Sequence, residues 1–177
     1  MLFDGTENQI ERPQDPDCQK DNYSGKKKKH TEVALLLTNK SRWIYYISDL
    51  YVGKEHDFNI FKTEFTPGLG WFKKFKVIVD LGFIGIDKYY EIKELLIGYK
   101  KPYKTKNNPN PKLTKDQKDW NKQVSKERIY VEHAIGGMKR FRMLINRARG
   151  NCNKFRNDII GLCAALWNYK LDFNSKS

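Results

Sequence analysis

The run Phe75-Lys76-Val77-Ile78-Val79-Asp80 decides the fold of this chain. It is short, apolar and rich in β-branched residues, which is typical of a strand buried on both faces in the middle of a sheet. We therefore predict a central strand at 75–80. The strand ends at an acidic residue, Asp80, which Leu81-Gly82-Phe83 follows.

Two apolar runs upstream predict a hairpin. Residues 30–38 and 42–49 have the composition of strands, and Asn39-Lys40-Ser41 between them suits a turn. Residues 1–5 predict the tail of an earlier strand. The polar segment 8–29, with its prolines and lysines, is expected to be a loop.

The segments before and after the central strand also fit a layered sheet. A short helix is predicted at 56–64 and one more strand at about 92–97. Residues 98–112 are rich in Lys, Pro and Asn and contain no acid, so they are expected to form a basic linker. Antiparallel strands followed by a central strand with helices around it predict an α/β fold, with a mixed sheet flanked by helices.

Two helices are predicted to complete the chain at its C-terminal end. Thr114 caps the first, with Asp116 in its first turn, and the apolar pattern continues to Leu144. The Gly136-Gly137 pair is expected to weaken or bend this helix. The second helix spans about 154–171, and its apolar side chains are expected to pack in the core. They are Ile159, Ile160, Leu162, Cys163, Leu166 and Trp167.

The charge of the chain points to a polyanionic partner. Lys and Arg number 34 against 21 Asp and Glu, a net charge of +13, which favours DNA, RNA or an anionic membrane surface. A biased base composition that raises Lys content throughout a genome is the alternative. No apolar run is long enough to cross a bilayer. The three cysteines lack the paired spacing of a zinc site, so we expect free thiols in a reducing cytoplasm.

Three acidic residues occupy positions from which they could meet. Asp4 is predicted to end the first strand, Asp80 ends the central strand, and Glu132 lies in the apolar stripe of a helix. Carboxylates at strand ends converge at the carboxyl edge of an α/β sheet. Three of them supply the core of a site for two divalent ions, Mg²⁺ or Mn²⁺, which act on phosphodiesters. The ordinary alternative is a turn residue at each aspartate and a surface residue at the glutamate.

Two basic residues share the helical face of Glu132. Arg128 precedes it by one turn and Lys139 follows it by two. One interpretation is a surface Arg–Glu ion pair. The other is a stripe in which Glu132 binds metal while Arg128 and Lys139 hold DNA phosphates. Residues 112–156 contain far more Lys and Arg than acids, which favours the second interpretation.

Short motifs follow one another along almost the whole chain. Asp4-Gly5-Thr6-Glu7 comes first, Gly53-Lys54-Glu55-His56-Asp57 is a Gly-x-x-His-Asp motif, and Asp80-Leu81-Gly82-Phe83 is an Asp-x-Gly-Phe motif. Arg128, Glu132 and Lys139 have the spacing of an Arg(3)Glu(6)Lys signature, in which Ser125 stands where Tyr is frequent. This ordered set resembles the insertion-sequence transposases of family five and their Harbinger-type relatives.

The resemblance implies an RNase H-like fold and a DDE nuclease and strand transferase. It maps Asp4, Asp80 and Glu132 onto the catalytic, metal-binding triad, with Asp57 as the rival of Asp80 and His56 beside it. DNA of the transposon ends and the target is the implied partner. The side chains expected to contact DNA are Arg128, Lys139, Arg140, Arg142, Lys26, Lys27 and Lys28.

The resemblance also sets the expected domain organisation. A catalytic domain would cover residues 1–173, with the linker at 98–112 and a short tail at 174–177. Family members usually carry an N-terminal helical region that recognises the element's ends, and here Asp4 is almost at the start. The chain is therefore interpreted as the downstream half of a frame-split gene, located at the bacterial nucleoid. An N-terminal half from an upstream reading frame and a homodimer are the protein partners that this leaves open, and a catalytically inactive remnant that only binds DNA is the alternative function.

Overall fold

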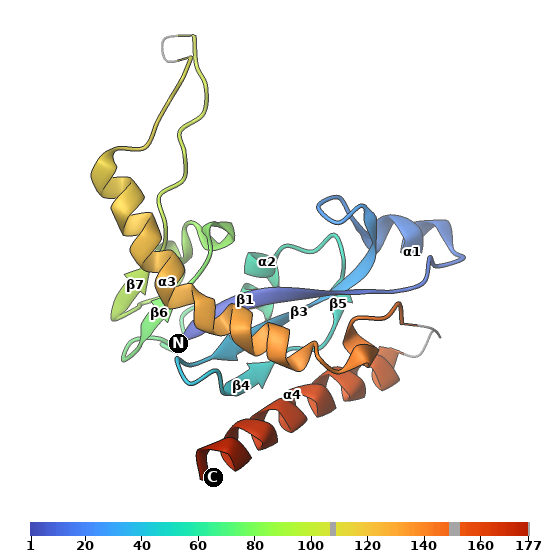
Figure 1. The fold of residues 1–177 in the computed structure, drawn as a ribbon. Coiled ribbons are helices and arrows are strands. Elements are labelled where there is room, and N and C mark those ends of the chain that lie inside the picture. Colours follow the sequence, from blue (N-terminus) through green and yellow to red (C-terminus); the bar gives the residue numbers. More distant parts are fainter. Residues whose placement is uncertain (107–108, 149–152, 177) are drawn as a thin grey trace.

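The computed structural model describes residues 1–106, 109–148 and 153–176. It is an α/β structure, in which a mixed, curled sheet is flanked by helices (Figure 1). The strands are β1 (Leu2–Gln9), β2 (Tyr23–Ser24), β3 (Lys29–Thr38), β4 (Ile44–Ile47), β5 (Tyr51–Val52), β6 (Lys76–Ile78) and β7 (Glu94–Leu96).

Four α-helices and three short 3₁₀ helices lie in the described residues. The two long helices, α3 and α4, follow one another at the C-terminal end of the chain, as predicted. The α-helices are α1 (Pro16–Asp21), α2 (Asp57–Glu64), α3 (Lys115–Met138) and α4 (Asn153–Lys176). The 3₁₀ helices are η1 (Leu81–Phe83), η2 (Ile86–Lys88) and η3 (Arg142–Leu144).

The sheet has the strand order β2-β3-β1-β6-β7, with β4 and β5 also paired to β3. β1 and β3 are antiparallel over eight residue pairs, whereas β6 is parallel to both β1 and β7. β1 meets β6 at a single pair, Leu2 and Ile78. Beyond that pair, no strand among the described residues covers the edge of β1 on the β6 side, and this opening positions the site described below.

The two faces of the sheet bury different helices because side chains alternate along each strand. Phe3, Val33 and Leu35 pack with α2 in one cluster, which contains Ile60 and Phe61. The opposite face packs against α3 and α4. Leu2 and Ile78 lie there with residues of α3, while Ala34 and Leu36 lie with residues of both helices. Figure 1 shows α3 running across the sheet and α4 beside its far end.

The first strand is longer than residues 1–5, so that prediction was wrong. β1 extends to Gln9, and Asp4 lies inside the strand opposite Leu36 rather than at its end. The polar residues after Gly5 conceal the strand from pattern analysis, because its pairing with β3 supplies the stabilisation that the side chains do not. The segment 8–29 is likewise not one loop, since it contains α1 and β2.

Helix α3 begins as expected but ends earlier. The Thr114 side chain accepts a hydrogen bond from the Gln117 backbone, and the Gln117 side chain returns one to Thr114, a complete capping box. The helix ends at Met138 and not at Leu144, which lies in η3. Gly137 is needed there, because a Cβ on it would lie 2.3 Å from the ring of Trp167 on α4.

Helix α4 extends through residues 174–176, which were expected to form a tail. Its core stripe consists of Ile160, Cys163, Ala164 and Trp167. Leu162 and Leu166 were expected in that stripe, but their side chains are exposed because they face away from the sheet.

The remaining boundaries agree with the sequence patterns to within about two residues. The predicted strands at 42–49, 75–80 and 92–97 appear as β4, β6 and β7, and the helix at 56–64 appears as α2. The connection from β7 to α3, predicted as a linker at 98–112, extends away from the sheet (Figure 1). Within the described residues, no helix has the length and apolarity that crossing a membrane requires.

Candidate functional site

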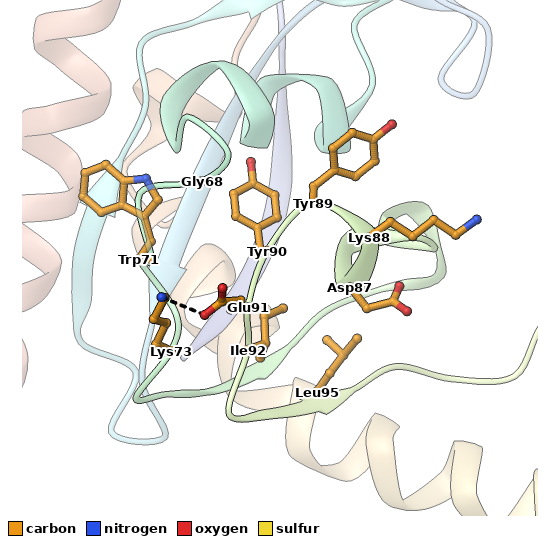
Figure 2. Close-up of a pocket in the computed structure, with 11 residues that line it drawn as sticks. Gly68, Trp71, Lys73, Asp87, Lys88, Tyr89, Tyr90, Glu91, Ile92 and Leu95 are labelled. Carbon is orange, nitrogen blue, oxygen red and sulfur yellow. Dashed lines mark ion pairs between the residues drawn. The ribbon is translucent and has the colours of Figure 1, made fainter.

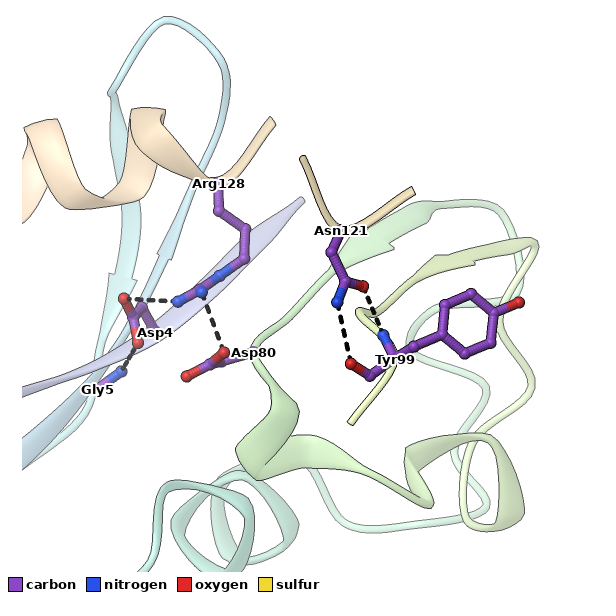
Figure 3. A network of polar contacts seen from close by, with 6 residues as sticks. All are labelled: Asp4, Gly5, Asp80, Tyr99, Asn121 and Arg128. Carbon is purple, nitrogen blue, oxygen red and sulfur yellow. Dashed lines mark hydrogen bonds and ion pairs between the residues drawn. The ribbon is translucent and has the colours of Figure 1, made fainter. Parts of the chain in front are cut away.

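The side chain of Arg128 joins the first two predicted carboxylates. Its Nη1 donates to Asp80 Oδ1 at 3.1 Å, and its Nη2 donates to Asp4 Oδ2 at 3.2 Å. Figure 3 shows the guanidinium group between the two aspartates. The Asp4 side chain is 19% exposed and that of Asp80 is 50% exposed, so one acid is enclosed and the other faces solvent.

Three elements bring these side chains together. Asp4 shares the face of β1 on which Leu2 packs under α3, and its Oδ1 accepts a hydrogen bond from the Gly5 backbone at 3.0 Å. Asp80 directly precedes η1, two residues beyond the parallel neighbour β6. Arg128 lies on α3, which crosses over both strands.

The N-terminal half of α3 is anchored to the segment that leaves β7. The Asn121 side chain accepts a hydrogen bond from the Tyr99 backbone at 2.7 Å and donates one to the Tyr99 carbonyl at 3.0 Å (Figure 3). The Trp120 ring nitrogen donates to the Ile97 carbonyl at 2.9 Å. These bonds fix the position of α3 relative to the segment after β7, and in that position Arg128 reaches both aspartates.

Asp57 approaches the site through the opposite face of β1. A Cβ placed on Gly5 would lie 2.2 Å from Asp57 Oδ1 and 2.8 Å from Oδ2, so the carboxylate lies directly against the Gly5 backbone. Asp57 is the first residue of α2, and the exposed His56 precedes it. The Gly of the Asp-Gly-Thr motif therefore makes room for the Asp of the His-Asp motif, a relation that no spacing in the sequence reveals.

The enclosed carboxylates hold their protons more tightly than usual. Burial raises the pKa of Asp4 to about 6, against the lowering effect of Arg128, and the negative charges of Asp57 and Asp80 add to the rise. The pKa of Asp57 is also raised by burial, while the positive charge of Lys26 lowers it and Glu7 and Asp80 raise it. The two acids are thus close enough to repel each other, as carboxylates around a shared cation do.

Lys139 lies beside Glu7 of β1, just beyond the end of α3 and not within the helix. It follows the last residue of α3, and its Nζ donates to the Glu7 carbonyl at 2.7 Å. Burial lowers the pKa of Lys139, and the positive charge of Lys27 lowers it further. The sequence motifs predict no role for Glu7, the last residue of Asp-Gly-Thr-Glu. Its side chain accepts a hydrogen bond from Thr31 at 3.0 Å.

The predicted basic residues divide into two sets. Lys26, Lys27 and Lys28 form the turn between β2 and β3, and the first two act electrostatically on Asp57 and Lys139 respectively. Arg140 and Arg142, which follow α3, have exposed side chains. The structure therefore brings the lysine turn to the site and leaves these two arginines on the surface.

Glu132 is not brought to the two aspartates. It is exposed on α3, one turn beyond Arg128, and it takes no part in the two ion pairs that join Arg128 to Asp4 and Asp80. Accordingly, residues 1–106, 109–148 and 153–176 contain no group of three His, Cys, Asp or Glu side chains arranged to hold one metal ion. Arg128, expected on DNA phosphates, instead contacts the carboxylates.

The residues at this site nevertheless fit a divalent cation. Asp4 and Asp80 already share one positive group, since the guanidinium of Arg128 stands in for a cation between them. Carboxylate oxygens are the ligands that Mg²⁺ and Mn²⁺ prefer. Glu132 lies one turn from Arg128 on the same face of α3.

A separate pocket lies away from these carboxylates. It is lined by aromatic and charged side chains, among them Trp71, Tyr89 and the Lys73–Glu91 ion pair at 2.8 Å (Figure 2). Its volume is about 510 Å³. Two Lys and two acidic side chains line it, so its charges are balanced, unlike the basic surfaces that bind a DNA backbone.

The comparisons with known proteins agree with the motifs. A model of the DDE superfamily endonuclease family matches residues 3–168. A protein of Microchaete diplosiphon described as "Probable transposase for insertion sequence element IS702" is 35% identical over 174 residues, which cover 97% of this chain and 57% of that relative. No solved structure matches the chain significantly. The match extends over nearly all of the chain and includes Asp4, Asp57, Asp80 and Glu132, and the chain therefore belongs to the DDE superfamily of endonucleases.

Proposed function

We propose that this chain is the catalytic domain of a DNA transposase, which cleaves DNA strands and transfers them with the help of divalent metal ions. The observation that carries the proposal is the cation position between Asp4, inside β1, and Asp80, two residues beyond its parallel neighbour β6. Membership of the DDE endonuclease family and the transposase relative support the same chemistry.

The proposed ligands are Asp4, Asp80 and Glu132, which would hold two Mg²⁺ or Mn²⁺ ions. Such ions, when bound, activate an attacking water or 3′-hydroxyl and stabilise the leaving oxygen of a phosphodiester. Asp4 contributes an enclosed carboxylate on a rigid strand, and Asp80 contributes an exposed one at the edge where DNA would enter. Asp57, on the other side of Gly5, is a positioning residue that keeps the β1 backbone in place.

An RNase H-like architecture is part of this proposal. The supporting feature is the sheet, in which β4, β3 and β1 are successive antiparallel neighbours while β6 and β7 continue it in parallel. The catalytic domain would then comprise residues 1–173. The last turn of α4 would belong to it as well.

The proposed DNA surface consists of the basic groups beside the acids. Lys26 and Lys27 bring the turn between β2 and β3 to the site, and Lys139 lies next to them with its ammonium group partly enclosed. Like charges held this close are stabilised by a phosphate backbone, which neutralises them. Lys28, Arg140 and Arg142 would extend the surface, and Arg128 would join it whenever it leaves the aspartates.

A catalytically inactive domain that only binds DNA is the second candidate. It is favoured by one specific observation, namely that Glu132 stands apart from Asp4 and Asp80 while Arg128 occupies the position between them. The chain spans 57% of the length of its transposase relative. We propose that an N-terminal half or a second copy supplies the recognition of the transposon ends, and that the protein acts on bacterial DNA in the cytoplasm, at the nucleoid.

The test is nicking of supercoiled plasmid DNA by the purified chain in Mg²⁺ or Mn²⁺, followed by strand transfer of a labelled oligonucleotide. We expect nicking that Asp80→Asn and Glu132→Gln abolish and that a chelator removes. Asp158→Asn is the matched control, because it removes one carboxylate on the exposed side of α4 and should leave nicking unchanged.

Two results would separate the candidates. DNA binding that persists in chelator, with no cleavage in either metal, would select the inactive binding domain. Equal nicking by the Asp80→Asn variant would rule out the proposed ligand set and point to a contaminating nuclease.

A further inference from the structure

Arg128 is held over the acids by two hydrogen-bonded ion pairs, whereas its Nε donor has no partner among the described residues. Its side chain is 16% exposed and makes two ion pairs through Nη1 and Nη2. Its Nε is buried, and among the described residues it has no hydrogen-bond partner. A buried donor without a partner costs free energy, so the two ion pairs are what keep this side chain in place.

From this geometry we propose that Arg128 is an internal counter-cation that competes with divalent metal for Asp4 and Asp80. In the metal-free chain it neutralises the two carboxylates and keeps them together. A bound metal ion takes over the same oxygen atoms, and the guanidinium then leaves. The inference rests on the proposed function, because it requires that the aspartates bind metal.

The competition follows from the contacts. Asp4 Oδ2 and Asp80 Oδ1 each accept from Arg128 at 3.1–3.2 Å, so the guanidinium fills the space between them. A divalent ion shared by those oxygens would lie within a few ångströms of the guanidinium charge, and the two cations would repel each other. Both cannot occupy the position.

The exchange also accounts for the position of Glu132. Arg128 and Glu132 are one turn apart on α3, and only one of them reaches the aspartates in this structure. Without metal, the positive Arg128 side chain is attracted to the two aspartates. Once a metal ion has brought positive charge, the negative Glu132 side chain is attracted there instead. The loss of Arg128 and the entry of Glu132 would therefore occur in the same step.

The test compares Mn²⁺ affinity by calorimetry in wild type, Arg128→Gln and Arg128→Lys. The pH should be about 8, so that Asp4 stays ionised when Arg128 is removed, since that group lowers its pKa. We expect Arg128→Gln to bind Mn²⁺ roughly tenfold more tightly than wild type. Arg128→Lys should fall between them, because an ammonium group is a point charge that does not bridge two carboxylates as a planar fork does.

Lys126→Gln is the matched control. It removes one positive charge from an exposed position on the same helix and should leave the Mn²⁺ affinity at the wild-type value. Thermal unfolding supplies a second readout. Metal-free Arg128→Gln should melt below wild type, and this difference should vanish at saturating Mn²⁺, a dependence that a purely structural arginine would not show. If Arg128→Gln fails to fold, Arg128→Lys decides by the same affinity comparison.

The outcomes distinguish this inference from the function on which it rests. Wild type and Arg128→Gln with equal Mn²⁺ affinity would overturn the competition and leave the metal site standing. Weaker binding by Arg128→Gln would overturn it too, since Arg128 would then assist the metal. An absence of Mn²⁺ binding in every variant would overturn both this inference and the proposed function.

Discussion

Replacing Gly5 by Ala tests whether the first and second motifs are in contact. The added Cβ would lie 2.2 Å, 2.5 Å and 2.8 Å from the three heavy atoms of the Asp57 carboxyl group. Ordinary contact begins at 3.4 Å, so the nearest oxygen must retreat by about 1.2 Å. Ile60 and Phe61 of α2 are fully buried in the core and oppose a shift of the helix, so the Asp57 carboxyl group itself must move out of its present position.

Two opposing effects set the magnitude. Ala in place of Gly inside a strand stabilises the folded state by roughly 0.5–1 kcal/mol, because the unfolded chain loses freedom. Overpacking costs about 1–3 kcal/mol. The clash is the larger effect, so we expect Gly5→Ala to lower the free energy of unfolding by about 1–2 kcal/mol. In an Asp57→Ala background the carboxyl group is absent, and the same substitution should be neutral or slightly stabilising.

The assay is urea unfolding followed by the fluorescence of the chain's 4 tryptophans, applied to both single variants and the double variant. The expected coupling between the two positions is about 1–2 kcal/mol. Gly25→Ala is a control, since a Cβ there meets nothing within 4 Å. The reasoning is refuted if Gly5→Ala costs as much in the Asp57→Ala background as it does alone.

Three further predictions concern the scaffold and the titration of the site. Arg156 contacts the oxygens of the buried Glu32 at 2.7–2.8 Å. Arg156→Ala would leave that carboxylate without its cation and should lower the free energy of unfolding by about 3–5 kcal/mol. Denaturant unfolding measures this loss, and a loss below about 1 kcal/mol would show the pair to be dispensable. Asp4 has a pKa of about 6 in the folded chain, above its value in the unfolded chain, so the stability of the metal-free protein should fall as pH rises from about 4 to about 6. In unfolding curves recorded across this range, Asp4→Asn should remove on the order of 2 kcal/mol of that fall. An unchanged pH profile in the variant would contradict the raised pKa of Asp4. Gly137→Ala should lower the melting temperature, because its Cβ would lie 2.3 Å from an indole ring of α4, whereas the adjacent Gly136→Ala, which meets open space, should raise it through helix propensity.

Elements with a strong local pattern could be predicted from the sequence. The Thr114 cap, the run at 75–80 and the helix at 56–64 each combine a composition with a boundary residue, and each appears within about two residues of its predicted position. Local patterns failed where neighbours far along the chain supply the stabilisation. β1 continues through polar residues because β3 pairs with it, and α3 stops at Met138, next to the close packing of Gly137 against Trp167 of α4.

The chemistry of the candidate site was visible in the sequence, but its arrangement was not. Family motifs identified Asp4, Asp80, Glu132 and Asp57 as the acids to consider. Which of these acids meet depends on the register between β1 and β6 and on the rotation of α3 about its axis. Residue spacing in the sequence reveals neither. Arg128, expected on DNA, is the clearest case, since it contacts an acid 124 residues away.

The sequence by itself determined the types of side chain available, the basic character of the chain and the family to which it belongs. Those properties are local, because each depends on a residue and its near neighbours. Only the tertiary structure decided that Asp4 and Asp80 share one guanidinium and that Asp57 rests on Gly5. The physical reason is that the run at 75–80 sets a strand, but the pairing of β6 with β1 and the packing of α3 across both set the distances between charges.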